Sequence, residues 1–264
     1  MNYINFNKNL IMRFLSLFLM LFVSIQLKSQ TVKILTYNIH HANPPSAANK
    51  IDIEAIAKVI NDSKADIVGI QEVDINVSRS EMMNQAEKLA EMTGMDYFFS
   101  KGIDLEKGYY GTVILSKHKI VGKRRYDLPM PVESENRSLA IVDVELPDGK
   151  TISLANTHLD LKEENRIAQA EFINELGELY SKPLILVGDL NATPNSKPIE
   201  ILEKYFVRNT SSNQPTSPNV NTKNEIDYIM VLKNKKFKWK EYEVIKEEYA
   251  SDHLPLYAEV VFSN

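Results

Sequence analysis

The chain has 264 residues, of which 44% are hydrophobic and 25% are charged, as in a globular protein with a sizeable core and one large or two small domains. It contains no cysteine, which excludes disulfides, thiolate metal sites and cysteine nucleophiles. Its formal net charge of −4 is unusual for a non-specific binder of long DNA, so this class is disfavoured although not excluded.

The first thirty residues differ from the rest of the chain. They carry three lysine or arginine residues and no acid, and residues 14–27 are almost wholly apolar. An apolar run of this length is typical of a signal peptide and is short for a membrane span, which needs about 20 apolar residues. We therefore expect a signal peptide over residues 1–29, export to the periplasm or the medium, and no stable membrane span in the mature protein. The alternative is an uncleaved N-terminal anchor.

From residue 31 onward, strand-like and helix-like patterns alternate. Apolar runs predict strands at 31–37, 67–70, 112–115, 139–146, 151–156, 184–187, 226–231 and 256–262, and helical spacing predicts helices at 52–61, 84–92 and 163–180. Asp148-Gly149 between two strand-like runs predicts a β-hairpin. Hairpins mixed with helical crossovers indicate an α+β fold in which two sheets pack together and helices lie outside.

Two polar segments stand apart from this alternation. Residues 208–224 lack periodicity, so we expect a long loop within the domain, and loops of this length are uncommon unless they are functional. The basic run 233–240 holds the only tryptophan, Trp239, and is most simply a solvated strand edge.

Polar side chains suited to metal or phosphate chemistry follow, or lie within, the strand-like runs. Carboxylate and amide oxygens are hard ligands that suit Mg²⁺ or Mn²⁺. Each such residue taken alone is more often a turn, cap or core residue, but together they favour a site built at strand ends. They are Asn38, Glu72, His158, Asp189, Asn191, Asp227, Asp252 and His253.

Hydrolysis of a phosphate ester needs a general base for water, donors for the phosphoryl oxygens and help for the leaving oxygen. His253 is suited to be the base, with Asp227 fixing its tautomer. Asn191 is suited to donate to a phosphoryl oxygen, and His158 to stabilise the phosphate or assist the leaving group.

Several short strings occur along the chain in the order found in one enzyme superfamily. They are YNIH at 37–40, QEVD at 71–74, YGTVILS at 110–116, NRS at 136–138, THLD at 157–160, GDLNATP at 188–194, IDYI at 226–229 and SDHLP at 251–255. In these strings the chain resembles the endonuclease/exonuclease/phosphatase superfamily, which is deoxyribonuclease I-like, and within it the short, often exported bacterial metal-dependent hydrolases. The resemblance covers residues 31–262. It implies a four-layer αββα sandwich, with two packed mixed β-sheets flanked by helices, and a catalytic domain over residues 30–264.

The resemblance also implies a metal site. Glu72 matches the principal metal ligand, with Asn38 beside it, and Asp252 belongs to the shell that joins the metal to the base. The implied cofactor is Mg²⁺ or Mn²⁺.

The same resemblance assigns catalytic roles. Asp189 and Asn191 match residues at the attacking water and the phosphate. Asp227 and His253 match the orienter–base pair, and His158 matches a histidine that contacts the phosphate in the nuclease and sphingomyelinase branches.

Three further residues are expected at the substrate. Arg137 and Tyr110 lie in matching strings and are expected to bind it. Arg79 fits the same branch, and for it a substrate contact and a salt bridge at a helix entry are equally weighted alternatives.

The resulting prediction is a divalent-metal-dependent phosphoesterase in which an Asp–His pair activates water, acting on a phosphate ester with a phosphodiester favoured. One alternative is a non-catalytic binding module on the same fold. Within the enzyme class, a nuclease and a sphingomyelinase or inositol-phosphate phosphatase stay open, with nucleic acid not favoured as a partner. We expect a monomer.

Overall fold

The computed structural model describes residues 31–47, 50–211 and 214–263, and these residues build two six-stranded β-sheets. The first sheet has the order β11-β12-β1-β2-β4-β3 and the second has the order β5-β6-β7-β8-β10-β9. The first consists of β1 (Thr31–Asn38), β2 (Ile67–Ile75), β3 (Asp96–Leu105), β4 (Gly108–Ser116), β11 (Phe237–Val244) and β12 (Leu256–Phe262). The second consists of β5 (Ile120–Asp127), β6 (Ser138–Glu145), β7 (Thr151–His158), β8 (Leu184–Asp189), β9 (Phe206–Arg208) and β10 (Asp227–Leu232).

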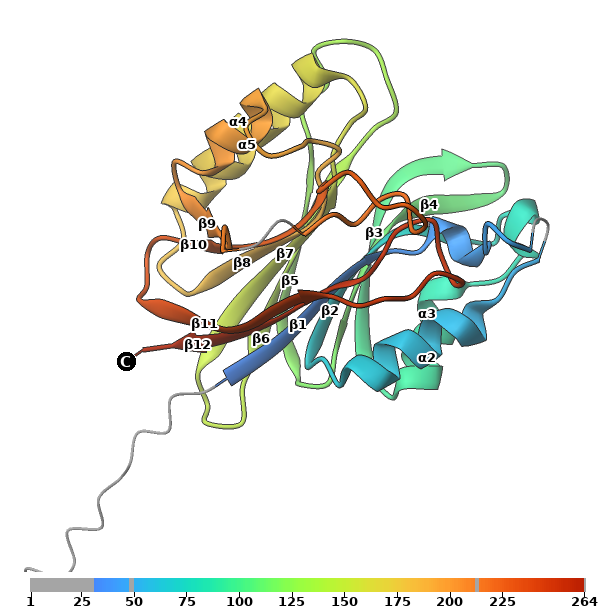
Figure 1. Ribbon diagram of the computed structural model, residues 1–264, viewed down its shortest axis with the longest axis horizontal. Helices are drawn as coiled ribbons and strands as arrows, with labels where there is room; N and C mark the ends of the chain where they lie inside the picture. Colours follow the sequence, from blue (N-terminus) through green and yellow to red (C-terminus); the bar gives the residue numbers. More distant parts are fainter. Residues whose placement is uncertain (1–30, 48–49, 212–213, 264) are drawn as a thin grey trace, which may run out of the picture. The chain divides into compact units, whose positions relative to one another are not determined.

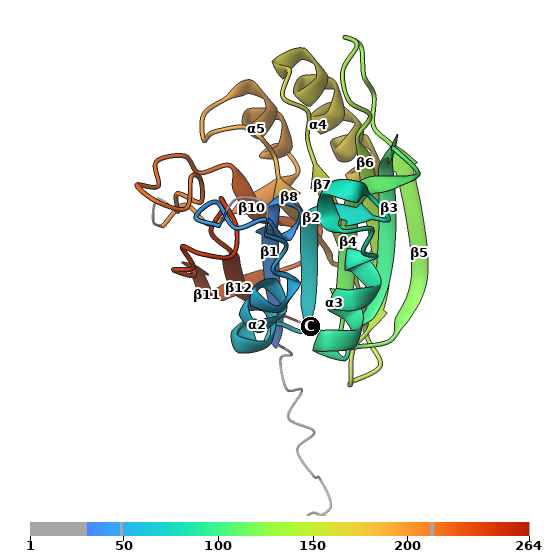
Figure 2. The same cartoon turned by 90° about the vertical axis from the view of Figure 1, so that its right-hand side faces the viewer.

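Both sheets are mixed, and their helices lie on the outside. The pairs β1–β2 and β7–β8 are parallel, and the other pairs are antiparallel. Helices α2 (Ile53–Ser63) and α3 (Gln85–Thr93) cover the first sheet, whereas α4 (Glu163–Glu178) and α5 (Lys197–Leu202) cover the second (Figures 1 and 2). The predicted four-layer αββα sandwich is therefore confirmed.

The alternation of side chains along a strand explains the layers. Leu35 and Tyr37 of β1 pack toward α2 and α3, whereas Val32 and Ile34 of the same strand pack between the two sheets. Successive strand residues point to opposite faces, so a strand buried on both faces reads as a nearly continuous apolar run. The predicted strand at 31–37 has this pattern.

Local sequence signals locate the starts of two helices and the turn of one hairpin. The carboxylate of Asp52 accepts from the amide of Ala55 and caps α2, and Asn84 caps α3 in the same way. The predicted hairpin joins β6 to β7, and Gly149 occupies its turn with φ of +80°.

Strands β3, β5 and β9 and helix α5 have no counterpart in the sequence analysis. Strand β5 is the clearest case, because it lies at a sheet edge and alternates between exposed and half-buried residues, with Lys123, Arg124 and Arg125 in its middle. The basic run at 233–240 contributes to β11, which is an edge strand as predicted.

Strand pairing brings the candidate residues to one end of the sandwich. Asp189 at the end of β8 is paired with His158 at the end of β7 and with Asp227 at the start of β10. In the first sheet, Asn38 at the end of β1 is paired with Gln71, which precedes Glu72.

Within the described part of the chain, no helix is long and apolar enough to cross a membrane. The predicted signal peptide at 1–29 lies outside the described residues.

Candidate active site

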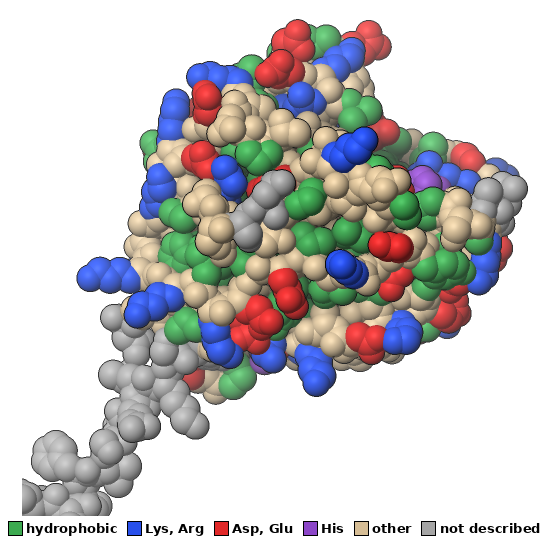
Figure 3. All heavy atoms as spheres, viewed as in Figure 1, with side chains coloured by type: hydrophobic (Ala, Val, Ile, Leu, Met, Phe, Trp, Pro, Cys, Tyr) green, Lys and Arg blue, Asp and Glu red, His purple; other side chains and the backbone are tan. Residues whose placement is uncertain are grey.

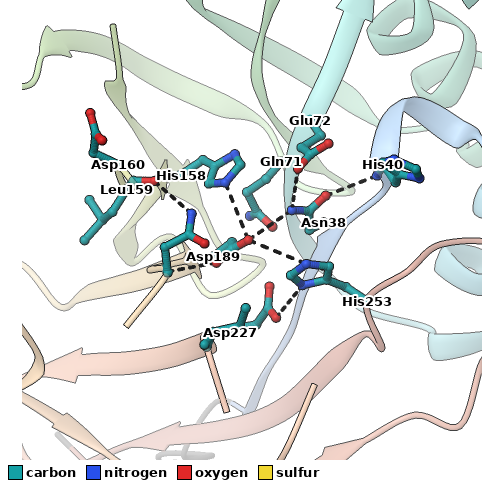
Figure 4. Close-up of polar contacts among 12 residues, drawn as sticks. Asn38, His40, Gln71, Glu72, His158, Leu159, Asp160, Asp189, Asp227 and His253 are labelled. Atoms are coloured by element: carbon teal, nitrogen blue, oxygen red, sulfur yellow. Dashed lines mark hydrogen bonds and ion pairs between the residues drawn. The ribbon is translucent and has the colours of Figure 1, made fainter. Parts of the chain in front are cut away.

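The buried carboxylate of Asp189 lies at the centre of the candidate residues (Figure 4). Its Oδ2 accepts a hydrogen bond from Asn38 Nδ2 at 3.0 Å. The same oxygen lies 3.5 Å from His158 Nε2 and 3.8 Å from His253 Nε2. Residues from β1, β7 and the segment before β12 therefore meet at one carboxylate.

His253 and Asp227 form a buried pair. His253 Nδ1 lies 2.8 Å from Asp227 Oδ2, which leaves Nε2 directed at Asp189. Burial opposes a charge on His253, but the charge and hydrogen bond of Asp227 raise its pKa to about 10. Burial and the nearby Asp227 raise the pKa of Asp189 to about 7.

The pKa of His158 is lowered, whereas that of His253 is raised. Arg137 Nη1 lies 3.1 Å from His158 Nδ1, and a guanidinium can only donate, so the ring proton of neutral His158 is on Nε2 and faces Asp189. Burial and the charge of Arg137 lower the pKa of His158 to about 3. His158 is thus a neutral hydrogen-bond donor toward the centre of the site.

Glu72 enters the site from a β-bulge in β2. Its φ is +59°, a value rare outside glycine, and such strain is commonly found at functional sites. Asn38 Nδ2 donates to Glu72 Oε1 at 3.0 Å, so one amide joins Glu72 to Asp189. Burial alone would raise the pKa of Glu72, but neighbouring His41, 3.9 Å away, and the Asn38 amide hold it well below its usual range.

The donors in the site fit a hard divalent cation. Asp189, Asp227 and His253 each offer a ligand atom, and these atoms lie within 4.8 Å of one another. Asp227 Oδ1 is buried without a hydrogen-bond partner, which is costly for a carboxylate that has nothing else to bind. The ionised carboxylate of Glu72, which accepts a hydrogen bond from the Asn38 amide, offers a further oxygen ligand. Because His253 and Asp227 pair with each other, the oxygen atoms left for a cation are those of Asp189, Glu72 and Asn38, which are hard ligands suited to a divalent cation.

Asn191 and Asp252 lie differently with respect to this centre. Asn191 has φ of +47°, its amide N–H donates to Asp189 Oδ1 at 2.9 Å, and its side chain donates to the Leu159 carbonyl at 3.0 Å. It therefore borders the site. The Asp252 carboxylate contacts the Ser251 hydroxyl at 3.4 Å and is outside the group of close ligand atoms found among the described residues.

The three expected substrate residues lie along one side of the site. Arg79 forms a two-pronged ion pair with buried Asp74, at 2.8 and 2.9 Å, and its guanidinium lies 5.2 Å from the centre of the Tyr110 ring. Tyr110 and Arg137 line a small recess next to His158. The salt bridge weighed for Arg79 is thus present, and 43% of the arginine side chain stays exposed beside Tyr110.

Sequence reasoning missed two residues that hold the site together. Thr216 Oγ1 donates to Asp227 Oδ2 at 2.6 Å, and Thr216 belongs to the long polar loop at 208–224. The unusual length of that loop was the only feature of the sequence that pointed to Thr216. Asn156 of β7 bonds to the β2 bulge from the opposite sheet, and no sequence pattern reports such a contact.

Comparisons with known proteins agree with this architecture. The family model described as "Endonuclease/Exonuclease/phosphatase family" matches residues 35–253. No protein among the curated sequences matches the chain.

Several solved structures share the fold. An endonuclease/exonuclease/phosphatase family protein from Bacteroides thetaiotaomicron has a TM-score of 0.75 and 22% identity, covering 89% of this chain and 99% of its own. A mannosyl-6-phosphatase from the same organism has a TM-score of 0.72 and 22% identity, and the match covers 88% of this chain and 100% of its own. The human Nocturnin catalytic domain with bound sulfate has a TM-score of 0.70 and 19% identity, and the match covers 90% of this chain and 96% of its own.

Proposed function

Because the chain belongs to the endonuclease/exonuclease/phosphatase family, we propose that it is a divalent-metal-dependent phosphoesterase in which the Asp227–His253 pair activates water. The observation that carries the proposal is the convergence of Asn38, His158 and His253 on Asp189, with Asp227 behind His253. This arrangement combines an oriented imidazole, a neutral N–H donor and a group of carboxylates within one buried site.

The two histidines have different tasks in the proposed reaction. His158 stays neutral because Arg137 donates to its Nδ1, so its Nε2–H is available to a phosphoryl oxygen throughout. His253 is held by Asp227 with Nε2 facing the site, where it can accept a proton from water. Asp189 lies between the two rings and can orient that water.

The carboxylates require a compensating charge before His253 can act as a base. Without it, Asp227, Asp189 and Asp252 keep a proton on the imidazole. We propose that Glu72 and Asn38, together with Asp189, hold a Mg²⁺ or Mn²⁺ ion. When bound, the cation supplies positive charge that neutralises the carboxylates and polarises a phosphoryl oxygen. His253 then loses its proton more readily and is able to accept one from water.

The substrate is proposed to be a phosphate ester, with a phosphodiester favoured. Arg79 presents a partly exposed guanidinium beside Tyr110, close to Glu72, where it can contact a second part of the substrate. On the face shown in Figure 3, Lys or Arg and Asp or Glu side chains are interspersed, which gives no support to binding of long nucleic acid. The mannosyl-6-phosphatase with this fold makes a sugar phosphate monoester the second substrate class to test.

Export remains part of the proposal, with residues 1–29 as a signal peptide and the domain from residue 30 as the catalytic unit. Mass spectrometry of protein recovered from outside the cytoplasm gives the N-terminus, and an intact residue 1 would contradict cleavage.

A substrate panel tests the function. Bis-p-nitrophenyl phosphate, p-nitrophenyl phosphate, sugar phosphates, inositol phosphates, sphingomyelin and plasmid DNA are each incubated with Mg²⁺, with Mn²⁺ and with excess chelator. We expect metal-dependent release of phosphate or p-nitrophenol from at least one ester, absent in Glu72→Gln. Binding of one of these compounds without turnover in either metal would instead favour the non-catalytic module.

A further inference from the structure

Strand β2 carries a β-bulge at the position of Glu72. It pairs with β4 in regular register up to Ile70 opposite Val113, and pairing resumes at Val73 opposite Gly111, so two residues of β2 face one of β4. A bulge breaks the regular ladder and changes the direction of a side chain. The positive φ of Glu72 belongs to this distortion. Glu72 therefore faces the site only while the bulge keeps its shape.

The side chain of Asn156 bonds to both strands beside this bulge, although it belongs to β7 of the other sheet. Its Nδ2 donates to the Ile70 carbonyl at 3.0 Å and to the Val113 carbonyl at 2.9 Å. These are the carbonyls of the last regular pair before the bulge. Its Oδ1 accepts from Gln71 Nε2 at 2.7 Å. The amide of Asn156 is fully buried and bonded at both ends.

Two neighbours make this close approach feasible. A Cβ on Gly69 would lie 3.0 Å from Asn156 Cγ and 2.4 Å from Val187 Cγ2, so glycine leaves the space that the amide occupies. Gln71 Nε2 also donates to Thr36 Oγ1 at 3.1 Å, which ties the bulge to β1. The contact is thus built from both sheets.

We infer that Asn156 is a positioning residue for the metal centre, because it fixes the bulge that presents Glu72. This inference rests on the proposed function, in which Glu72 is the principal metal ligand. Asn156 lies two residues before His158 and on the same face of β7. Strand β7 therefore carries both His158, the proposed hydrogen-bond donor to the phosphate, and Asn156, which orients Glu72 through the bulge.

Mn²⁺ affinity, measured from the electron paramagnetic resonance signal of free Mn²⁺, distinguishes positioning from simple stabilisation. Asn156→Leu removes all three hydrogen bonds, and we expect Mn²⁺ to bind about 10- to 100-fold more weakly. Asn156→Ser keeps an uncharged hydroxyl that is able to donate to one of the two carbonyls, and it should fall between this variant and the wild type. Asn174→Leu is the matched control, because Asn174 is a buried asparagine of α4 that donates to the Ile201 carbonyl far from β2. It should lose stability without losing affinity.

Equal Mn²⁺ affinities for wild type and Asn156→Leu, or an equal loss in Asn174→Leu, would overturn the inference. Should Asn156→Leu fail to fold, Asn156→Ser makes the same comparison with Asn174→Ser.

Amide hydrogen exchange of the metal-free proteins separates this inference from the proposed function. We expect the peptide spanning 67–75 to exchange at least about 10-fold faster in Asn156→Leu than in wild type, with no such change in Asn174→Leu. If wild-type protein binds no Mn²⁺, the proposed function fails, and the exchange result alone then decides whether Asn156 holds the bulge. Unchanged exchange at 67–75 would show that it does not.

Discussion

Thr216 donates a 2.6 Å hydrogen bond to Asp227 Oδ2, the same oxygen that lies 2.8 Å from His253 Nδ1. The backbone of Thr216 also accepts from the Leu254 amide at 2.7 Å. Thr216 thus fixes both members of the Asp–His pair, since its side chain holds Asp227 and its backbone holds Leu254, the residue after His253.

Removal of this hydroxyl should slow the reaction without abolishing it. Thr216→Val keeps the shape of the side chain but leaves Asp227 with one partner fewer, and we expect kcat to fall about 10- to 100-fold, as for one lost hydrogen bond to a charged group. Steady-state kinetics on the best substrate of the panel measures the effect. Thr93→Val is the control, since Thr93 bonds to the Leu89 carbonyl within α3. A comparable loss in both variants would argue against a specific role for Thr216.

Arg137 should determine the protonation state of His158. In Arg137→Met the buried ring loses an adjacent positive charge, so the pKa of His158 should rise from about 3 toward its ordinary value. Nitrogen NMR of the imidazoles in the metal-free protein follows this titration. We also expect kcat to fall by about 10²-fold or more, because the donor to the phosphoryl oxygen is no longer fixed.

Arg124→Met is the control for that experiment. Arg124 pairs with Asp143 on the β5–β6 hairpin, and its loss should leave the His158 titration unchanged. An unaltered His158 pKa in Arg137→Met would contradict the assignment.

The stability of the metal-free protein should fall as the pH rises from about 6.5 to about 10. The pKa of Asp189 is raised to about 7 and that of His253 to about 10, so the native state holds both protons more tightly than the unfolded chain does. Up to about pH 6.5 the lowered pKa of His158 acts in the opposite direction and offsets the contribution of Asp189. The contribution of His253 is complete below about pH 6.5 and is lost by about pH 10. We expect a fall of at least about 1 kcal/mol from this source, measured by urea unfolding across this range.

Two controls test whether this dependence of stability on pH comes from the site. His253→Gln should flatten the curve between about pH 6.5 and pH 10, and saturating Mg²⁺ should stabilise the protein more at high pH than at low pH. A wild-type slope that His253→Gln leaves intact would mean that other groups cause it.

The sequence predicted the parts of the fold and site that depend on local pattern. The strands that end in Asn38, His158 and Asp189 are buried on both faces and read as apolar runs, so their ends could be located directly. The grouping of these residues then follows from strand pairing, which the family resemblance supplied in advance.

The remaining parts depend on contacts that sequence patterns do not contain. Strand β5 was missed because a basic edge strand needs few apolar residues. Thr216 and Asn156 were missed because each acts on a partner in another element, 11 and 86 residues away in the chain. Asp252 was predicted from its place beside a strand-like run and from the resemblance, and its role in the shell between the metal and the base stays a prediction.

The central claim is that a divalent cation and the Asp227–His253 pair act together on a phosphate ester. The most direct measurement is the rate of bis-p-nitrophenyl phosphate hydrolysis by wild type and His253→Ala, with Mg²⁺ or Mn²⁺ and after chelation. We predict metal-dependent turnover by wild type, its loss in chelator, its recovery when metal is returned, and a fall of about 10³-fold or more in His253→Ala. Hydrolysis that persists in excess chelator, or that His253→Ala leaves unchanged, would contradict the account.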